Sequence, residues 1–410
     1  MQIKPILSAM RHHKAGVLLI ALQIALTLAI VCNALFIIQQ RLAHLSEPTG
    51  IDETSVFVIS NQWAGQSSES QVDAQIQADM TALRQLPSVR DASPSDSYPL
   101  RGTGWDDYIM LTPEQTEKTT DADVYLGDEH LLDTLGVKLI AGRNFRMGEV
   151  GRLGARQNVA SPIVIVTKAL ADRLYPDGSA LGKSFYEMSK TPSTIVGIVE
   201  LLQNQSVRTW KTAYAYQSVI RPLREVNLGG TFYIVRAKPG QLAAAMREVP
   251  KALYAQSRLR IIDSKDGELS FAEVRRRIYE TDRGMAIMMG IICVVLLAIT
   301  AAGIVGLTSF WVGQRRRQIG VRRALGATRA DILSYFLTEN LLITVGGVLV
   351  GIVLAIGINL WMVTQFEMAR LSPIYVLIGV VVLLLLGQGA VLAPARRASN
   401  VPPVEATRSV

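Results

Sequence analysis

The sequence predicts a multi-pass membrane protein with four transmembrane α-helices and a large, two-lobed α+β extracytoplasmic domain inserted between the first two helices. Three observations lead to this prediction. The chain has four long apolar runs, hydrophobic residues make up 49% of it against 19% for charged residues, and its basic residues gather beside the apolar runs. That placement of the net charge of +8 is typical of membrane orientation and disfavours a nucleic-acid-binding stripe.

The first apolar run, residues 15–38, follows a basic segment at residues 1–14. About 20 helical residues cross a bilayer, so the run is long enough to span. A cleaved secretory signal has the same order of basic and apolar residues, but this run is too long for one and lacks an Ala-x-Ala end. We therefore predict an uncleaved first span whose preceding segment lies in the cytoplasm.

Residues 51–280 are polar and contain no run long enough to span, so they are predicted to form the extracytoplasmic domain. Each end of this segment has a strand–helix–strand pattern. Two such units predict a ferredoxin-like base lobe of residues 51–98 and 229–268, with residues 99–228 inserted as an outer lobe. The predicted elements, in chain order, are a strand at 55–60, a helical face at Val72, Ile76, Met80 and Leu83, a strand at 88–92, a strand at 231–237, a helix at 241–255 and a strand at 258–263.

Three further spans are predicted at residues 284–313, 335–363 and 374–393, followed by a cytoplasmic tail at 394–410. The second span measures about 45 Å at 1.5 Å per residue. Because this exceeds the hydrocarbon core, its outer part should form a stalk. The two cysteines, Cys32 and Cys293, lie inside apolar runs, so no disulfide framework is predicted for the domain.

Small residues recur every fourth position in three of the spans. Such spacing lets helix backbones approach closely in a membrane, where lipid provides no hydrophobic driving force. We predict three packing seams; the alternative is that small residues are simply common in membrane helices. The predicted seam residues are Ala21, Ala25 and Ala29, then Ala298, Ala302 and Gly306, then Gly347, Gly351 and Ala355.

The segment between the second and third spans, residues 314–331, is strongly basic, which predicts a cytoplasmic location. Val321, Ala324 and Leu325 fall on one face of a short helix. Gly326 is placed to end that helix. Thr328 and Asp331 have the spacing of a capping box that opens the next helix. From these residues alone, an anchor that only fixes topology remains an alternative.

The stretch Gln318-Ile-Gly-Val-Arg-Arg-Ala-Leu-Gly-Ala-Thr328 resembles the signature of the FtsX/MacB superfamily of ABC transporter permeases. The resemblance continues at 135–145, 165–176, 194–199 and the C-terminal end, and it is weak in the acidic stretch 105–123. It implies that residues 314–331 contain a coupling helix that docks on a nucleotide-binding subunit. The residues that it assigns to coupling are Arg315, Arg317, Ile319, Gly320, Val321, Arg322, Arg323, Ala324, Leu325, Gly326 and Ala327, with Thr328 and Asp331 as capping residues.

Glu339 lies near the start of the third span, where a carboxylate is costly unless it is paired or hydrated. Two interpretations remain open. Glu339 pairs with an arginine of the 315–329 loop, or it is an interfacial acid that reaches water.

The segment 178–184 is close to the nucleotide-binding P-loop motif, but it has three residues instead of four between its first glycine and Gly-Lys-Ser. We expect no nucleotide there. The sequence also lacks the common hydrolase and paired-cysteine metal motifs. The chain is therefore predicted to be non-catalytic, with no cofactor or metal of its own and with ATP and magnesium bound by a partner subunit. Since the chain begins almost directly with a span, that ATPase is expected on a separate polypeptide.

The predicted function is that of the permease subunit of a MacB-type ABC transporter in a bacterial inner membrane, with both termini cytoplasmic. The resemblance implies a second permease subunit, identical or paralogous, and mechanotransmission of ATP-driven motion to the periplasmic domains for export. A periplasmic adaptor and an outer-membrane channel are further partners that it allows. The alternatives are a lipoprotein-releasing permease, an FtsX-like regulator of cell-wall hydrolases, or a sensor with an extracytoplasmic ligand domain.

Overall fold

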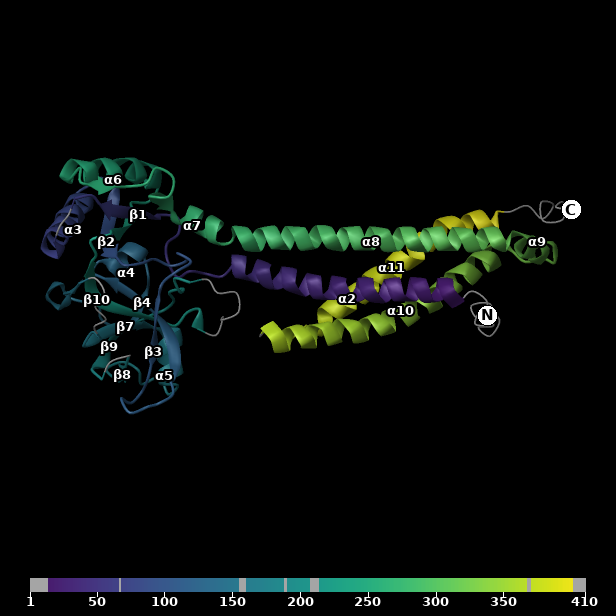
Figure 1. Ribbon diagram of the computed structural model, residues 1–410, viewed down its shortest axis with the longest axis horizontal. Coiled ribbons are helices and arrows are strands. Elements are labelled where there is room, and N and C mark those ends of the chain that lie inside the picture. Colours follow the sequence, from purple (N-terminus) through teal and green to yellow (C-terminus); the bar gives the residue numbers. More distant parts are fainter. Residues whose placement is uncertain are drawn as a thin grey trace. The chain divides into compact units, whose positions relative to one another are not determined.

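The computed structural model describes residues 14–65, 68–154, 160–187, 190–206, 214–366 and 370–400. Nearly all of the predicted N-terminal segment, and residues 401–410 of the predicted tail, therefore lie outside the described residues. The chain forms two compact units (Figure 1). One is Glu47–Glu280, and the other combines Met1–Ser46 with Thr281–Val410, as expected for a domain inserted after a first span.

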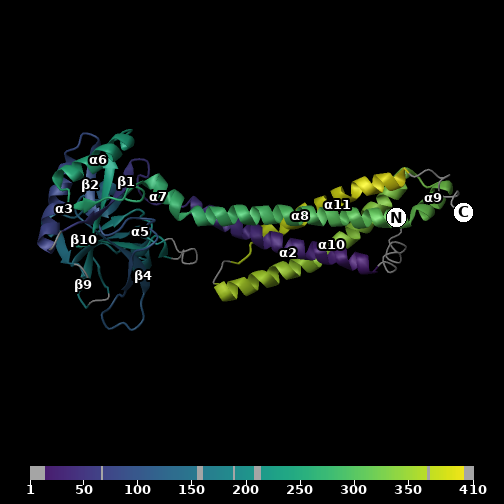
Figure 2. The same cartoon turned by 45° about the horizontal axis from the view of Figure 1, so that its top comes forward.

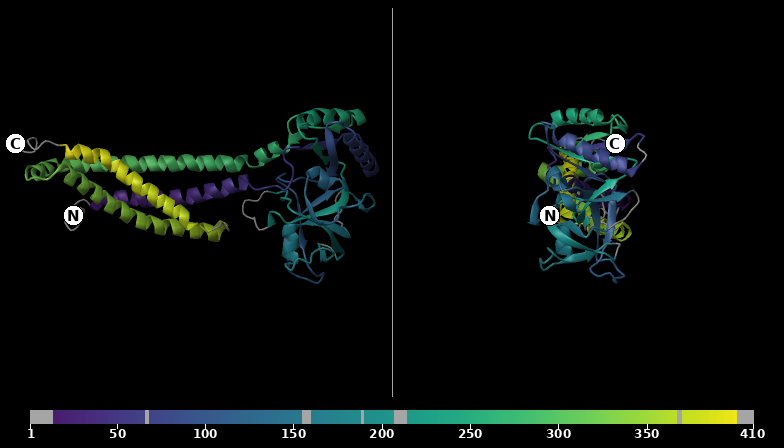
Figure 3. Two further views of the ribbon diagram at one scale, coloured as in Figure 1. Left: turned by 180° about the vertical axis from the view of Figure 1, so that it is seen from behind. Right: turned by 90° about the vertical axis from the view of Figure 1, so that its left-hand side faces the viewer.

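The base lobe of Glu47–Glu280 has the predicted ferredoxin-like fold. Its strands lie in the order β12-β1-β11-β2, with antiparallel neighbours, which is the order of a β-α-β-β-α-β unit. The helices α3 and α6 lie side by side (Figure 3) and share one apolar core with these strands. The elements are β1 (Val56–Trp63), α3 (Glu69–Arg84), β2 (Val89–Ser95), β11 (Thr231–Ala237), α6 (Leu242–Gln256) and β12 (Arg260–Ile261).

The core of the base lobe is formed by the face of α3 that the sequence predicted. The side chains of Val72, Ile76, Met80 and Leu83 are all buried, because residues three or four apart share one side of a helix. The helix begins at the Ser68 cap, whose hydroxyl accepts a hydrogen bond from the Gln71 amide at 3.3 Å. Helical periodicity therefore determined both the element and its buried side.

The outer lobe continues the same sheet. From the base lobe the strand order runs on as β2-β4-β10-β7-β9-β5, and the junction is the single register pair Ser95↔Gly127 between β2 and β4. Its elements are β3 (Trp105–Ile109), β4 (Thr120–Gly127), α4 (Leu131–Leu135), β5 (Leu139–Gly142), the 3-10 helix η1 (Met147–Glu149), β6 (Gly151–Gly154), β7 (Ile163–Thr167), α5 (Lys168–Leu174), β8 (Ser184–Tyr186), β9 (Pro192–Val199) and β10 (Ser218–Val226). The domain ends with β13 (Glu268–Ser270), which pairs with β1, and α7 (Phe271–Ile278).

The predicted boundary of the outer lobe at residue 99 needs one correction. Helix α4 falls inside the range 99–228 but packs on the base-lobe strands β2 and β11. The Arg236 guanidinium of β11 donates to the Asp133 carbonyl of α4 at 2.9 Å. A local pattern cannot show to which part of a sheet a short helix returns, so this assignment depended on tertiary contacts.

The second unit contains four helices long and apolar enough to cross a membrane: α2 (Lys14–Leu45), α8 (Glu280–Gln314), α10 (Arg329–Phe366) and α11 (Pro373–Ser399). The short helix α9 (Arg316–Ala324) lies between α8 and α10 (Figure 2). All four long helices extend beyond the predicted spans, most clearly α2 beyond residue 38 and α11 beyond residue 393. The apolar runs stop at polar residues, but Gln, Arg and Ala continue a helix readily.

Two of the three predicted small-residue seams meet each other, on α2 and α10. An added Cβ at Gly347 of α10 would lie 2.7 Å from the Ala21 carbonyl oxygen, and one at Gly351 would lie 2.9 Å from the Ala25 carbonyl oxygen. Ala25, Ala29 and Ala355 are also buried. The Asn33 amide donates to the Ala355 carbonyl at 3.1 Å, which adds a polar link between the two helices.

We expect Gly347→Leu to separate α2 from α10, because its side chain would collide with the backbone of α2. The neighbouring Gly346 has no atom within 4 Å of its would-be Cβ, so Gly346→Leu is the matched control. Overpacking costs about 1–3 kcal/mol, which should lower the midpoint of thermal unfolding in detergent by several degrees for Gly347→Leu only. Equal midpoints for the two variants would contradict the close packing of α2 on α10.

The described residues leave the third predicted seam uncovered. Ala298, Ala302 and Gly306 are all exposed on α8. Instead α8 contacts α2 through polar groups: the Thr27 and Thr300 hydroxyls lie 2.8 Å apart, and the Gln23 amide donates to the Ile299 carbonyl at 3.1 Å. Threonine and glutamine at these positions gave no sequence signal that distinguished them from other polar residues in a span.

Candidate functional site

The candidate site is the basic segment that contains α9. Its helix has two faces with different roles. Ile319 is 6% exposed and belongs to the same apolar cluster as Ile332 and Phe336 of α10, so this face attaches α9 to its own helix bundle. On the other face, Leu325 is 83% exposed and Val321 is 48% exposed. The sequence analysis included Ile319 among the coupling residues, but in the structure its side chain faces the helix bundle.

The end of α9 is fixed by backbone geometry. Gly326 has φ of +100°, in the left-handed region that glycine adopts without steric penalty. Its amide donates to the Arg323 carbonyl and the Ala327 amide donates to the Arg322 carbonyl, each at 3.1 Å. These two bonds form a Schellman motif, which satisfies carbonyls that would otherwise be left open at the helix end. Leu325 is thus presented at a defined position.

The start of α10 has the predicted capping box. The Asp331 carboxylate accepts from the Thr328 amide at 2.9 Å and from the Thr328 hydroxyl at 2.6 Å, and the Asp331 amide donates back to that hydroxyl at 3.2 Å. These reciprocal bonds satisfy backbone donors of the first turn. Together with the Schellman motif, they leave only a short connection between α9 and α10.

Glu339 forms an ion pair with Arg315. The Arg315 Nη1 lies 3.0 Å from Glu339 Oε2, and the two side chains are 11% and 4% exposed. Of the two interpretations left open by the sequence, the structure contains the pair with the loop arginine. Since an unpaired carboxylate at this depth would be costly, the contact also holds the start of α9 against α10.

Most of the other arginines of the segment are exposed. Arg322 lies over the Tyr335 ring, with its Cζ 5.1 Å from the ring centroid. Arg316, Arg317 and Arg329 are exposed. The segment therefore presents both a small apolar surface, formed by Val321, Ala324 and Leu325, and several exposed positive charges.

The P-loop-like segment 178–184 lacks the geometry of a phosphate loop. It follows α5 and enters the strand β8, whereas a P-loop connects a strand to the N-terminus of a helix. The Ser179 hydroxyl donates to the Asp177 carboxylate at 2.8 Å, so this loop carries a negative charge of its own. That no nucleotide binds here stays a prediction.

Comparison with known families identifies the family to which the chain belongs. The family model "MacB-like periplasmic core domain" matches residues 17–252, and the model "FtsX-like permease C-terminal" matches residues 290–403. The chain is a MacB-like permease of the FtsX superfamily. It is therefore a component of the ABC transporter permease class and a multi-pass membrane protein with a large extracytoplasmic domain.

Individual relatives agree with this assignment. The permease is 26% identical to the macrolide export ATP-binding/permease protein MacB 1/2 of Paracoccus denitrificans, over 98% of this chain and 57% of that protein. It is 24% identical to MacB of Chromobacterium violaceum, over 78% of this chain and 49% of that protein. The permease thus spans about half the length of these curated relatives. It is also 26% identical to the uncharacterized ABC transporter permease YvrN of Bacillus subtilis, over 70% of this chain and 69% of that protein.

The crystal structure of the periplasmic region of MacB from Actinobacillus actinomycetemcomitans aligns with 57% of the permease and 97% of that chain, at 14% identity and a TM-score of 0.34.

Proposed function

We propose that the permease docks on a separate ATPase subunit through α9 and converts ATP binding and hydrolysis there into motion of its extracytoplasmic domain. The observation that carries this proposal is the 83% exposed Leu325, held at a hydrogen-bonded helix end in a segment with several exposed arginines. A leucine so exposed beside charged residues is costly in water and gains free energy when it enters an apolar groove. The surrounding arginines fit a partner groove with an acidic rim.

The attachment of α9 to the membrane helices supports a role in transmission. Ile319 packs in the bundle core, Arg315 pairs with Glu339, and the capping box fixes the start of α10 only a few residues after the end of α9. A displacement imposed on Leu325 would therefore be passed to α8 and α10 rather than absorbed by a loose loop. We infer that this is the first step of mechanotransmission, with α8, of 35 residues, carrying the motion outward.

We further propose that a second permease subunit, identical or paralogous, covers the exposed stripe of α8. Ala298, Ala302 and Gly306 are spaced for close backbone approach, and α2 leaves them uncovered. In this arrangement the segment 314–331 lies in the cytoplasm and Glu47–Glu280 lies outside a bacterial inner membrane. The proposed result of the cycle is export of a periplasmic or envelope substrate, in which an adaptor and an outer-membrane channel would take part.

Site-specific crosslinking tests both the docking and the orientation. Leu325→Cys, in a background with Cys32→Ala and Cys293→Ala, should crosslink to the ATPase subunit of the assembled transporter through a short bifunctional thiol reagent. Thr364→Cys, near the other end of α10, is the control and should not. Crosslinking at Thr364 but not at Leu325 would place the ATPase on the wrong side for this proposal.

A further inference from the structure

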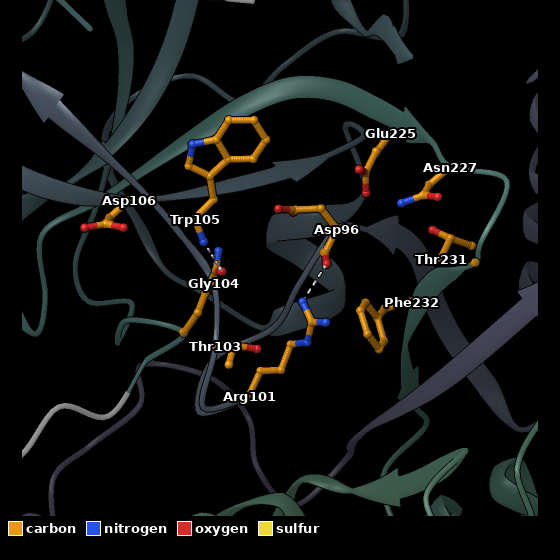
Figure 4. A pocket seen from close by; sticks show the side chains of 12 residues that line it. Asp96, Arg101, Thr103, Gly104, Trp105, Asp106, Glu225, Asn227, Thr231 and Phe232 are labelled. Atoms are coloured by element: carbon orange, nitrogen blue, oxygen red, sulfur yellow. Dashed lines mark hydrogen bonds between the residues drawn. The ribbon is translucent and has the colours of Figure 1, made fainter. Parts of the chain in front are cut away.

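A pocket of about 550 Å³ lies in the extracytoplasmic domain, where the base-lobe strand β11 meets the outer-lobe strands β3 and β10. Its volume is within the range of small-molecule sites. Six of its lining residues carry the inference, and Figure 4 shows them together: Asp96, Arg101, Trp105, Asp106, Glu225 and Phe232.

The pocket has an excess of negative charge. Three carboxylates face it, from Asp96, Asp106 and Glu225, against the single guanidinium of Arg101. Arg101 is already engaged elsewhere: its Cζ lies 4.4 Å from the Phe232 ring centroid, and its Nη1 donates to the Asp96 backbone carbonyl at 3.3 Å. Among the described residues it forms no ion pair with the carboxylates of Asp96 or Glu225, and its positive charge acts on both of them from a greater distance.

The carboxyl groups of Asp96 and Glu225 both have raised pKa values. Burial raises the pKa of Asp96 to about 7, and the nearby charge of Glu225 adds to this, against the lowering effect of the Leu126 amide that donates to Asp96 Oδ1 at 2.8 Å. Burial also raises the pKa of Glu225. The other titratable or charged groups around Asp96 are Arg101, Tyr125 of β4 and the more exposed Asp106. The attraction of a cation placed beside these carboxylates would offset the free-energy cost of ionising them in a buried position.

The rim of the pocket is held in place before any ligand arrives. Leu100 is buried with φ of +63°, and its amide donates to the Asn204 carbonyl at 3.3 Å. The buried Gln205 accepts from the Trp105 amide at 3.1 Å. A leucine in the left-handed region costs about 1 kcal/mol or more and persists only where its surroundings enforce it. The backbone at Trp105 is thereby held at the pocket, and Figure 4 shows Trp105 and Asp96 among the lining side chains.

We propose that this pocket binds a monovalent organic cation, whose ammonium group lies against Asp96 and Glu225 and whose apolar body lies on the Trp105 indole. Ammonium groups are attracted both by carboxylates and by the face of an indole. A metal ion fits less well, because among the described residues no three histidine, cysteine or carboxylate side chains are grouped so that they could hold one; the three carboxylates of this pocket do not form such a group. The proposal does not depend on the docking of α9.

The test uses the full-length chain in phosphatidylcholine nanodiscs, with benzyltrimethylammonium as the probe and benzyl alcohol as its neutral analogue. We expect saturable binding of the cation, at least about tenfold tighter than binding of the alcohol, and a loss of tenfold or more with Asp96→Asn/Glu225→Gln. Trp105→Leu leaves the carboxylates intact and should weaken binding as well. Asp172→Asn, on the exposed face of α5, is the matched control and should bind like the wild type.

Because the probe keeps its charge at every pH, a change of its affinity with pH reports groups of the protein. A cation favours the ionised carboxyl group, so affinity should rise from pH 6 to pH 8 as Asp96 ionises, by about tenfold for a group titrating near 7. The rise should disappear in Asp96→Asn. Equal affinity of the wild type and the double variant, or absence of saturable cation binding, would overturn the proposal, whereas the α9 crosslinking result would stand.

Discussion

Leu325→Asp should abolish stable binding of the ATPase subunit while leaving insertion and orientation of the permease unchanged. Leu325 is the most exposed apolar residue of the α9 surface, at 83%, so a charge there costs the isolated permease almost nothing. In the docked state it would place an unpaired carboxylate in an apolar groove. Truncation of a central interface anchor typically costs about 2 kcal/mol or more, which corresponds to a loss of about 30-fold in affinity.

The measurement is co-purification of the ATPase subunit, together with ATP hydrolysis by the reconstituted transporter. Ala330→Asp is the matched control: it adds the same charge five residues away, at an exposed position in the first turn of α10, where a carboxylate suits the helix dipole. All arginines of the segment remain in both variants, so topology should be preserved. If Leu325→Asp retained its partner and full hydrolysis, α9 would be a positive-inside anchor and not a docking helix.

Asp79→Asn should destabilise the extracytoplasmic domain more than any other conservative change in its base lobe. The side chains of Asp79 and Arg260 are fully buried. The two Nη atoms of the Arg260 guanidinium donate to the two carboxylate oxygens of Asp79, each at 2.9 Å. The Tyr233 hydroxyl also donates to Asp79 Oδ2 at 2.6 Å. Removing the carboxylate charge leaves a guanidinium buried without its counterion, which costs about 3–5 kcal/mol.

For a domain of this size, such a loss should lower the midpoint of thermal unfolding by about 10 °C, measured on the full-length chain in detergent. The exposed ion pair of Asp172 and Lys168 provides the control, because Asp172→Asn should shift the midpoint by about 2 °C at most. The double variant Asp79→Leu/Arg260→Met, which removes both charges, should be less destabilised than Asp79→Asn. If the single and double variants were equally destabilised, lost packing and not the unpaired charge would explain the effect.

The two predictions differ in how far the sequence could have led to them. The α9 surface follows from local rules: the spacing of Val321, Ala324 and Leu325, the glycine at 326 and the Thr328–Asp331 capping box specify a short helix, its end and the next start. The Asp79–Arg260 pair does not, because its members are far apart in the chain and look like ordinary surface charges of a helix and a strand. Only the return of β12 alongside β1 brings Arg260 to Asp79.

Hydrophobic runs and periodicity by themselves determined the four spans, the inserted domain, its strand–helix–strand units and the amphipathic segment, since each depends on interactions between residues close in sequence. The two units also predicted the ferredoxin-like base, although its strands β1 and β11 pair across the whole inserted lobe. Tertiary structure alone decided which small-residue seams meet, that Ile319 faces inward, that Glu339 pairs with Arg315 and that α4 belongs with the base lobe. It also decided that Asp96 and Glu225 line one pocket. The physical reason is the same in each case: side chains brought together across the fold interact through distances that spacing along the chain does not encode.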